Sequence, residues 1–181
     1  MDTETPSPAK RHREAGPTRL RAAILTVSDS RTAATDRSGD LLAEELETAG
    51  HQVTVREILP DEPDQVRAWL ASTAERDDVD LILLNGGTGI SRRDRTFEAV
   101  SSLLERILPG FGELFRLLSF EEIGAAAMAS RAVAGTIGNK LVFCTPGSPA
   151  AVKLALERLI LPEAGHLVGE LRKEDNSSST G

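Results

Sequence analysis

The stretch of sequence that decides the fold is Val79-Asp80-Leu81-Ile82-Leu83-Leu84-Asn85-Gly86-Gly87-Thr88-Gly89. Residues 79–84 form an almost unbroken apolar run, which is typical of a central strand covered on both faces. The glycine-rich run 86–89 follows directly. Because parallel sheets bind ligands beyond the carboxyl ends of their strands, this junction predicts both the centre of a sheet and a binding site.

Strand and helix patterns alternate around this stretch. Strands are predicted over residues 20–28 and 52–59, and amphipathic helices over 41–49, 66–73 and 97–107. Such alternation predicts an α/β fold in three layers, a mostly parallel sheet with helices on both faces.

The second half of the chain is less regular. Gly138 and Asn139 form a two-residue turn signal between two apolar runs, which predicts a hairpin on the C-terminal side of the domain. The elements predicted here are a mainly helical segment over 111–129, strands over 132–137 and 141–145, and a final helix over 150–171 that passes or kinks at Pro162.

Composition limits the domain count. The 181 residues are the size of one domain, which we place at residues 19–172. The segments 1–18 and 173–181 carry no apolar periodicity, so we predict two disordered tails.

Composition also limits the partners and the compartment. The formal net charge of -7, from 21 basic and 28 acidic residues, disfavours a nucleic-acid partner, whose phosphates must be neutralised. Cys144 is the single cysteine and cannot form an internal disulfide. No apolar run approaches the roughly 20 residues of a membrane span, so we expect a cytoplasmic protein without membrane contact.

The glycine-rich run is the sharpest candidate for chemistry. Three glycines within residues 86–89 allow backbone N–H groups to face an anion, and Arg92 and Arg93 add positive charge nearby. The run matches neither the Walker A nor the dinucleotide-binding pattern. A tight turn without a ligand is the alternative explanation for the same glycines.

Two carboxylates, Asp61 and Asp94, follow strand ends and precede predicted helices. One interpretation is that they hold a hard cation such as Mg²⁺ beside phosphates. The other is that they cap helices, and the spacing alone favours capping. Asp29, after the first strand, presents a similar choice between a site residue and an acceptor for its own loop backbone.

An ordered set of motifs then points to a family, because several short patterns occur in one order across residues 20–172. They are Thr26-Val27-Ser28-Asp29-Ser30, Asp36-Arg37-Ser38-Gly39, Pro60-Asp61-Glu62, Gly86-Gly87-Thr88-Gly89, Arg93-Asp94-Arg95-Thr96, Pro109-Gly110-Phe111-Gly112-Glu113, Ser130-Arg131-Ala132-Val133-Ala134-Gly135 and Pro146-Gly147. Together they resemble the molybdopterin-binding family of molybdenum cofactor biosynthesis, and residues 115–124 are similar to its B branch.

The resemblance implies a Rossmann-like fold and a defined reaction. Active family members transfer AMP from Mg-ATP to the terminal phosphate of molybdopterin and release pyrophosphate. The resemblance therefore implies Mg²⁺ as cofactor, ATP as co-substrate and molybdopterin as substrate. It also implies a homotrimer or homohexamer, and the downstream metal-insertion protein as a further partner.

The resemblance also assigns residues. Asp61 and Asp94 match the family's essential acidic positions, which makes them the implied catalytic and metal-binding pair. Asp29 or Asp61 would alternatively accept from pterin N–H groups. The implied substrate-binding residues are Ser28, Asp29, Gly86, Gly87, Thr88, Gly89, Ser130, Pro146, Gly147 and Ser148.

One departure from the family pattern and one retained residue bear on activity. Family members commonly carry Asn or Gln at the position of Ser148. Some members of the B branch have lost the acidic residue after the glycine loop, whereas this chain keeps Asp94, which favours a competent enzyme. The alternative is a non-catalytic pterin-binding or scaffold protein of the same pathway. A generic nucleotide-binding regulator would explain the glycine run but not the ordered motifs.

Overall fold

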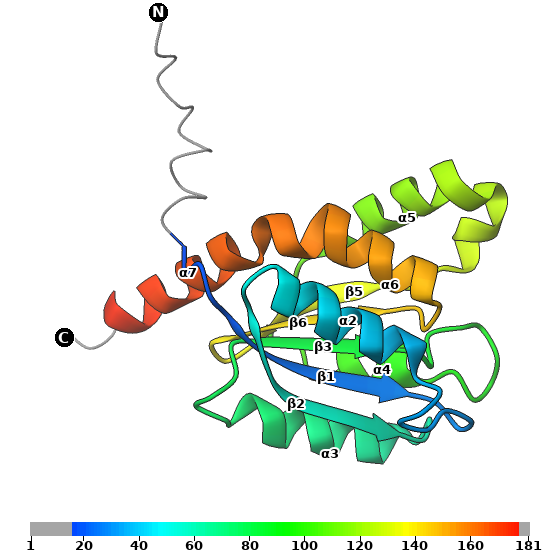
Figure 1. Ribbon diagram of the computed structural model, residues 1–181, viewed down its shortest axis with the longest axis horizontal. Coiled ribbons are helices and arrows are strands. Elements are labelled where there is room, and N and C mark those ends of the chain that lie inside the picture. The colour runs from blue at the N-terminus through cyan, green and yellow to red at the C-terminus, as the bar shows by residue number, and fades with distance from the viewer. Residues whose placement is uncertain (1–15, 178–181) are drawn as a thin grey trace, which may run out of the picture.

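A single six-stranded sheet organises the molecule (Figure 1), and the computed structural model describes residues 16–177. The strands are β1 (Arg21–Val27), β2 (Gln52–Leu59), β3 (Leu81–Asn85), β4 (Arg106–Ile107), β5 (Val133–Ile137) and β6 (Lys140–Thr145). Their order is β2-β1-β3-β6-β5-β4; the first four are parallel, and β5 and β4 continue the sheet in antiparallel pairing. This confirms the mostly parallel α/β fold and the hairpin.

Helices cover both faces of the sheet, as the three-layer prediction requires. They are α2 (Arg37–Thr48), α3 (Pro63–Ala74), α4 (Thr96–Ser101), α5 (Pro109–Ile123), α6 (Pro149–Ala155) and α7 (Leu161–Ser177), with a 3₁₀ segment η1 (Gly124–Ala129) and a π-helical segment η2 (Leu156–Ile160). Within residues 16–177, no helix is long and apolar enough to cross a membrane.

Alternating side chains of β1 build two separate cores. Ile24 faces the core shared with α2, α5, α6 and α7, whereas Leu25 faces the core shared with α3 and α4. Both side chains are fully buried, as expected for a central strand covered on both faces. Cys144 lies in the second core, where burial raises the pKa of its thiol to about 12, so it acts as a small packing residue.

The third predicted helix is wrong in its second half. It was expected to reach residue 107, but α4 ends at Ser101. Ile107 instead pairs with Gly135 of β5 as part of the short edge strand β4. Leu103 and Leu104 pack against the second core from the connecting turn, so their apolar spacing reflects burial without a helix.

The predicted tails are partly ordered. Helix α7 continues to Ser177, so the disorder predicted from residue 173 onward is wrong for residues 173–177. Gly16 and Pro17 lie against α7, where their backbone occupies the space that a Cβ on Gly165 or Gly169 would need. Residues 1–15 and 178–181 of the predicted tails lie outside the described part of the chain.

The predicted final helix is interrupted before Pro162. Residues 156–160 form the π-helical segment η2, and α6, η2 and α7 follow one another without a gap. Proline lacks an N–H donor and disturbs the preceding turn, and a π-helical segment is one way to absorb that disturbance.

Asp80 ties the amino-terminal end of the sheet to α7. Its carboxylate accepts hydrogen bonds from the Arg21 backbone and guanidinium at 2.8–3.0 Å and from Arg172 at 2.8 Å. Burial raises the pKa of Asp80, but the hydrogen bonds from Arg21 and Arg172 outweigh it and lower that pKa from 3.8 to about 2.

We predict that Asp80→Asn lowers the free energy of unfolding by about 1 kcal/mol at pH 7 and by much less at pH 2. A lowered carboxyl pKa stabilises the folded state above the unfolded value of 3.8, and this contribution is lost as the pH falls through about 2. Arg21 and Arg172 are 39% and 46% exposed, so solvent screening limits the effect.

Urea unfolding at the two pH values measures this difference. The control is Asp78→Asn, which breaks an exposed ion pair with Arg76 and should change stability less. An equal loss of stability for Asp80→Asn at both pH values would contradict the assignment.

Candidate functional site

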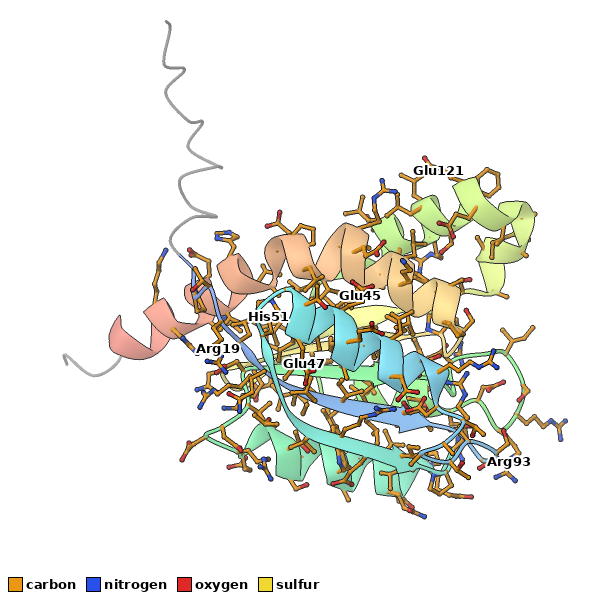
Figure 2. All side chains as sticks on the ribbon, viewed as in Figure 1. Arg19, Glu45, Glu47, His51, Arg93 and Glu121 are labelled. Atoms are coloured by element: carbon orange, nitrogen blue, oxygen red, sulfur yellow. The ribbon has the colours of Figure 1, made fainter. Side chains whose placement is uncertain are left out.

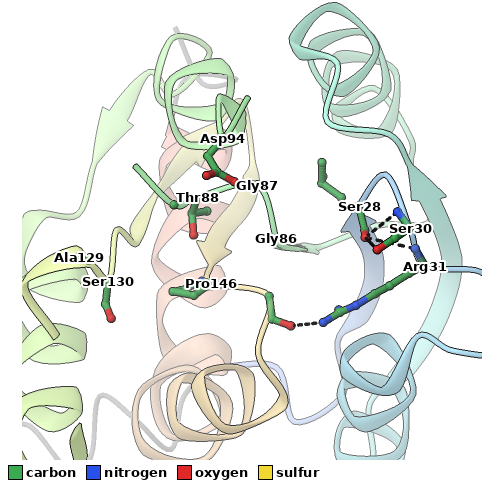
Figure 3. Close-up of a pocket in the computed structure, with 13 residues that line it drawn as sticks. Ser28, Ser30, Arg31, Gly86, Gly87, Thr88, Asp94, Ala129, Ser130 and Pro146 are labelled. Atoms are coloured by element: carbon green, nitrogen blue, oxygen red, sulfur yellow. Dashed lines mark hydrogen bonds between the residues drawn. The ribbon is translucent and has the colours of Figure 1, made fainter. Parts of the chain in front are cut away.

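A cavity of about 420 Å³ opens at the carboxyl ends of β1, β3 and β6 (Figure 3). Arg93 lies at this end of the sheet, and Arg19 and His51 lie at the other end (Figure 2). The cavity is lined by Val27, Ser28, Ser30, Arg31, Gly86, Gly87, Thr88, Gly89, Asp94, Ala129, Ser130, Pro146 and Gly147. The loops after three neighbouring strands therefore meet where the sequence predicted a site.

The glycine loop needs glycine for two physical reasons. Gly86 and Gly87 adopt positive φ angles of 98° and 59°, which favour glycine. A Cβ on Gly86 would also lie 2.1 Å from the Val27 carbonyl oxygen, and one on Gly87 would lie 2.1 Å from Thr96 Oγ1. The loop backbone is thus pressed against its neighbours and is itself part of the cavity wall.

Asp61 stands behind the glycine loop and is not among the described residues that line the cavity. Its side chain accepts a hydrogen bond from Thr96 Oγ1 at 3.2 Å, and a Cβ on Gly87 would lie 2.6 Å from its Oδ2. The residue is 8% exposed. The N-cap of α3 is Glu62, so capping of that helix does not explain Asp61.

The pKa of Asp61 is raised. Burial is the largest cause, the hydrogen bond from Thr96 opposes it, and the charges of Asp94 and Asp29 raise the pKa further. These carboxylates therefore lie close enough to repel one another. In the part of the chain that the structure describes, no group of three or more histidine, cysteine or acidic side chains is arranged to hold a metal ion unaided.

Asp94 faces the cavity from the far end of the glycine loop. Its Oδ2 accepts a hydrogen bond from the Ser91 backbone N–H at 3.0 Å, and a Cβ on Gly89 would lie 2.6 Å from the same oxygen. The N-cap of α4 is Arg95, so Asp94 does not cap that helix. The carboxylate closes its own loop and presents its charge to the cavity.

The residues that the resemblance assigned to substrate binding divide into two groups. Gly86 to Gly89, Ser28, Ser130, Pro146 and Gly147 all line the cavity, whereas Asp29 and Ser148 are not among the described lining residues. Ser148 is the N-cap of α6 and accepts from the Ala151 N–H at 3.2 Å.

Asp29 supports the site from outside the cavity. Its Oδ1 accepts from the Asp61 backbone N–H at 3.1 Å, and its Oδ2 lies 3.0 Å from a guanidinium nitrogen of Arg93. Asp29 thus links the loop after β1 to the loops after β2 and β3.

Arg131 clamps the glycine loop, a role that sequence reasoning missed. Its Nε donates to the Thr88 carbonyl at 2.8 Å, and its Nη2 donates to the carbonyls of Asp94, at 2.9 Å, and Gly89. The guanidinium also pairs with Glu98 and lies 5.0 Å from the centre of the Phe97 ring. Arg131 belongs to the motif at residues 130–135, but an arginine within a motif gives no signal that it binds backbone carbonyls.

We predict that Arg131→Gln loosens this loop, because three carbonyls lose their donor. The free energy of unfolding should fall by about 2 kcal/mol, and trypsin should cut faster after Arg92 and Arg93. The control is Arg116→Gln on an exposed part of α5. Cleavage at an unchanged rate in Arg131→Gln would show that the loop does not depend on the clamp.

Comparison with known proteins assigns the family. Residues 23–166 match the model described as a probable molybdopterin binding domain. The chain is 54% identical to the Molybdenum cofactor biosynthesis protein B of Halalkalibacterium halodurans, over 91% of this chain and 98% of that protein. It is 49% identical to the protein of the same name from Bacillus subtilis, over 90% and 96% of the two chains.

Solved structures agree. A crystal structure of Molybdenum cofactor biosynthesis protein B matches with a TM-score of 0.85 and 52% identity, covering 87% of this chain and 98% of that one. The tungsten cofactor synthesizing protein MoaB from Pyrococcus furiosus matches with a TM-score of 0.78 and 36% identity, over 86% and 99% of the two chains. Because sequence and fold agree over nearly the full length of these relatives, this chain belongs to the molybdopterin-binding domain family of molybdenum cofactor biosynthesis, in its B branch.

Proposed function

We propose that this protein catalyses the Mg-ATP-dependent adenylylation of molybdopterin, forming adenylyl-molybdopterin and pyrophosphate. The observation that carries the proposal is Asp94, a carboxylate held on the cavity wall beside a glycine loop whose backbone is open to a ligand. Gly86 and Gly87 have positive φ angles, as in loops whose main chain closely approaches a phosphate, although the Gly86 N–H itself donates to the Thr145 carbonyl at 3.1 Å.

The reaction asks little covalent chemistry of the protein. A phosphate oxygen of the pterin attacks the α-phosphorus of ATP, the bond between the α-phosphorus and the bridging oxygen breaks, and pyrophosphate leaves. Two anions must be brought together and aligned, and that is a positioning task. The cavity has polar walls, formed by Ser28, Ser130 and the glycine loop, that can position the two anions. The reaction needs no side chain to act as a nucleophile.

The residues present fit the magnesium ion that the family implies. Mg²⁺ in such sites is held by one or two carboxylates together with substrate phosphates and water. Asp94 would hold it from the cavity wall, and Asp61 adds negative charge directly behind the loop. When bound, Mg²⁺ supplies neutralisation of the phosphate charges that otherwise repel.

Oligomer, partner and compartment are part of the same proposal. We propose a homotrimer or homohexamer because apolar side chains of α5 are about half exposed in the single chain: Leu114, Leu117, Phe120 and Ile123. The adenylylated product would pass to the downstream metal-insertion protein. The buried, unpaired Cys144 suits a reducing cytoplasm.

A non-catalytic pterin-binding or scaffold protein is the competing function. It would need the cavity and the glycine loop but not the carboxylate on the cavity wall. The position of Asp94 favours the enzyme, and its removal separates the two functions.

We predict that Asp94→Asn lowers kcat for pyrophosphate release by at least about 100-fold while the affinity for molybdopterin stays within about threefold. Asparagine keeps an oxygen that accepts from the Ser91 N–H, so the loop should remain folded. Anaerobic assays with Mg-ATP and molybdopterin measure the rate, with Asp64→Asn on the exposed start of α3 as control. Wild-type turnover by Asp94→Asn would remove the catalytic role of this carboxylate.

A second variant separates function from stability. Because the pKa of Asp61 is raised, its ionised form costs folding free energy at neutral pH, and this cost disappears as the pH falls below the unfolded value of 3.8. Asp61→Asn should therefore raise the melting temperature at pH 7 and not at pH 3, while it lowers activity. A lower melting temperature together with full activity would contradict both parts.

A further inference from the structure

We propose that Arg31 binds a phosphate group of the substrate in this cavity, and that the buried Asp36 is the residue that positions it. The inference rests on the proposed function in taking a phosphate as the ligand. That phosphate has two possible sources, the terminal phosphate of molybdopterin and the triphosphate of ATP, which the experiment below distinguishes.

Arg31 gives the cavity a positive wall. Among the described residues that line it, Arg31 is the one basic side chain and Asp94 the one acidic side chain, and Figure 3 shows them on different sides of the cavity. Its Nη2 donates to the Gly147 carbonyl at 2.7 Å. A guanidinium carries five N–H donors, so donors remain for an anion.

Two other arginines near the site already contact acceptor groups of the protein itself. Arg131 donates to carbonyls of the glycine loop. Arg93 lies 3.0 Å from Asp29 and 3.6 Å from Glu62. Arg31 is thus the guanidinium best placed to neutralise a phosphate inside the cavity.

Asp36 holds a fixed negative charge behind Arg31. Its side chain is fully buried, and its Oδ1 lies 3.6 Å from Arg31 Nη1. It accepts hydrogen bonds from Thr26 Oγ1 at 2.8 Å, the Gly39 N–H at 3.0 Å and Arg56 Nη2 at 3.2 Å. With three donors around it, the carboxylate has a fixed orientation, and so has the guanidinium that it attracts.

The same network reaches the strand ends that form the cavity. Asn85 Nδ2 donates to Thr26 Oγ1 at 2.9 Å, and these two residues are partners in the pairing of β1 with β3. Ser38, next to the Asp36 cap, donates through Oγ to the Gly147 carbonyl at 2.7 Å, the carbonyl that Arg31 also binds. Asp36 therefore connects the end of the sheet, the start of α2 and the cavity wall around Arg31.

Calorimetric titration of the full chain tests the role of Arg31, with Mg-ATP and anaerobic molybdopterin as separate ligands. Arg31→Gln should weaken the binding of one of them by about 10-fold or more, and the affected ligand identifies the phosphate. Arg31→Lys keeps the charge without the planar fork and should fall between Arg31→Gln and wild type. The control is Arg37→Gln, a neighbouring exposed arginine outside the cavity lining, which should stay within about twofold.

A double-mutant cycle tests the positioning role of Asp36. Asp36→Asn retains an oxygen for the Gly39 N–H, so the helix start is kept. If Asp36 acts through Arg31, Asp36→Asn weakens ligand binding in the wild-type background and not in the Arg31→Gln background. If Asp36→Asn does not fold, Thr26→Val, which removes a donor to Asp36, takes its place in the cycle.

Each outcome decides one part of the proposal. Unchanged affinity of Arg31→Gln for both ligands, or no binding of either ligand by folded wild-type protein, overturns the role of Arg31. Equal weakening by Asp36→Asn in both backgrounds overturns the positioning role. Ligand binding that depends on Arg31, without pyrophosphate release, would contradict the adenylylation and retain the role of Arg31. Pyrophosphate release together with ligand binding that does not depend on Arg31 would support the adenylylation and contradict the role of Arg31.

Discussion

The contact on which the site depends is the one between Gly87 and the two side chains behind it. Thr96 Oγ1 and Asp61 Oδ2 occupy the space that a Cβ on Gly87 would need, so the loop backbone and the buried carboxylate are held against each other. The Thr96 backbone N–H also donates to the Gly87 carbonyl at 2.9 Å. The loops after β2 and β3 and the start of α4 are thereby joined, and the cavity acquires a wall made of backbone.

Two buried aspartates at opposite ends of the sheet lie in opposite electrostatic surroundings. Asp80 is neutralised by Arg21 and Arg172, and its pKa is lowered to about 2. Burial is the main cause that raises the pKa of Asp61, and the charges of Asp94 and Asp29 raise that pKa further. An incompletely neutralised buried charge next to a cavity is a mark of a binding or catalytic site, because it costs stability unless a ligand uses it. In the proposed reaction, that ligand is a cation held beside phosphates.

Much of the fold could be predicted from local pattern. Strand β2 has the predicted bounds, and the turn at Gly138 and Asn139 joins β5 to β6. Local sequence pattern predicted the wrong secondary structure where apolar residues with helical spacing are buried from a turn. Leu103 and Leu104 have helical spacing yet pack from a turn. The helical end of α7, residues 173–177, has a polar sequence without apolar periodicity, which resembles a tail.

The position of the site could be predicted from the sequence, but the placement and contacts of its individual residues could not. The order of glycine and acidic motifs located the cavity, because each motif follows a strand that ends at the same edge. Sequence could not say that Asp61 lies behind the loop and Asp94 in front of it. Both follow the end of a strand and precede a helix, and that order does not fix the direction in which either side chain points. Nor could sequence find the role of Arg131, whose partners Thr88 and Asp94 are distant along the chain and accept through backbone carbonyls. The side-chain contacts of Asp36 with Thr26 and Arg31 likewise form only in the folded chain.

The most direct test of the account is the identity and stoichiometry of the products. Wild-type protein would be incubated anaerobically with molybdopterin and Mg-ATP, with mass spectrometry of the pterin and quantitation of pyrophosphate. Adenylylation predicts a pterin that is heavier by one adenylyl group, with one pyrophosphate released for each adenylylated pterin. Tight pterin binding with no adenylylated product, or release of inorganic phosphate and ADP instead, would contradict the proposed function.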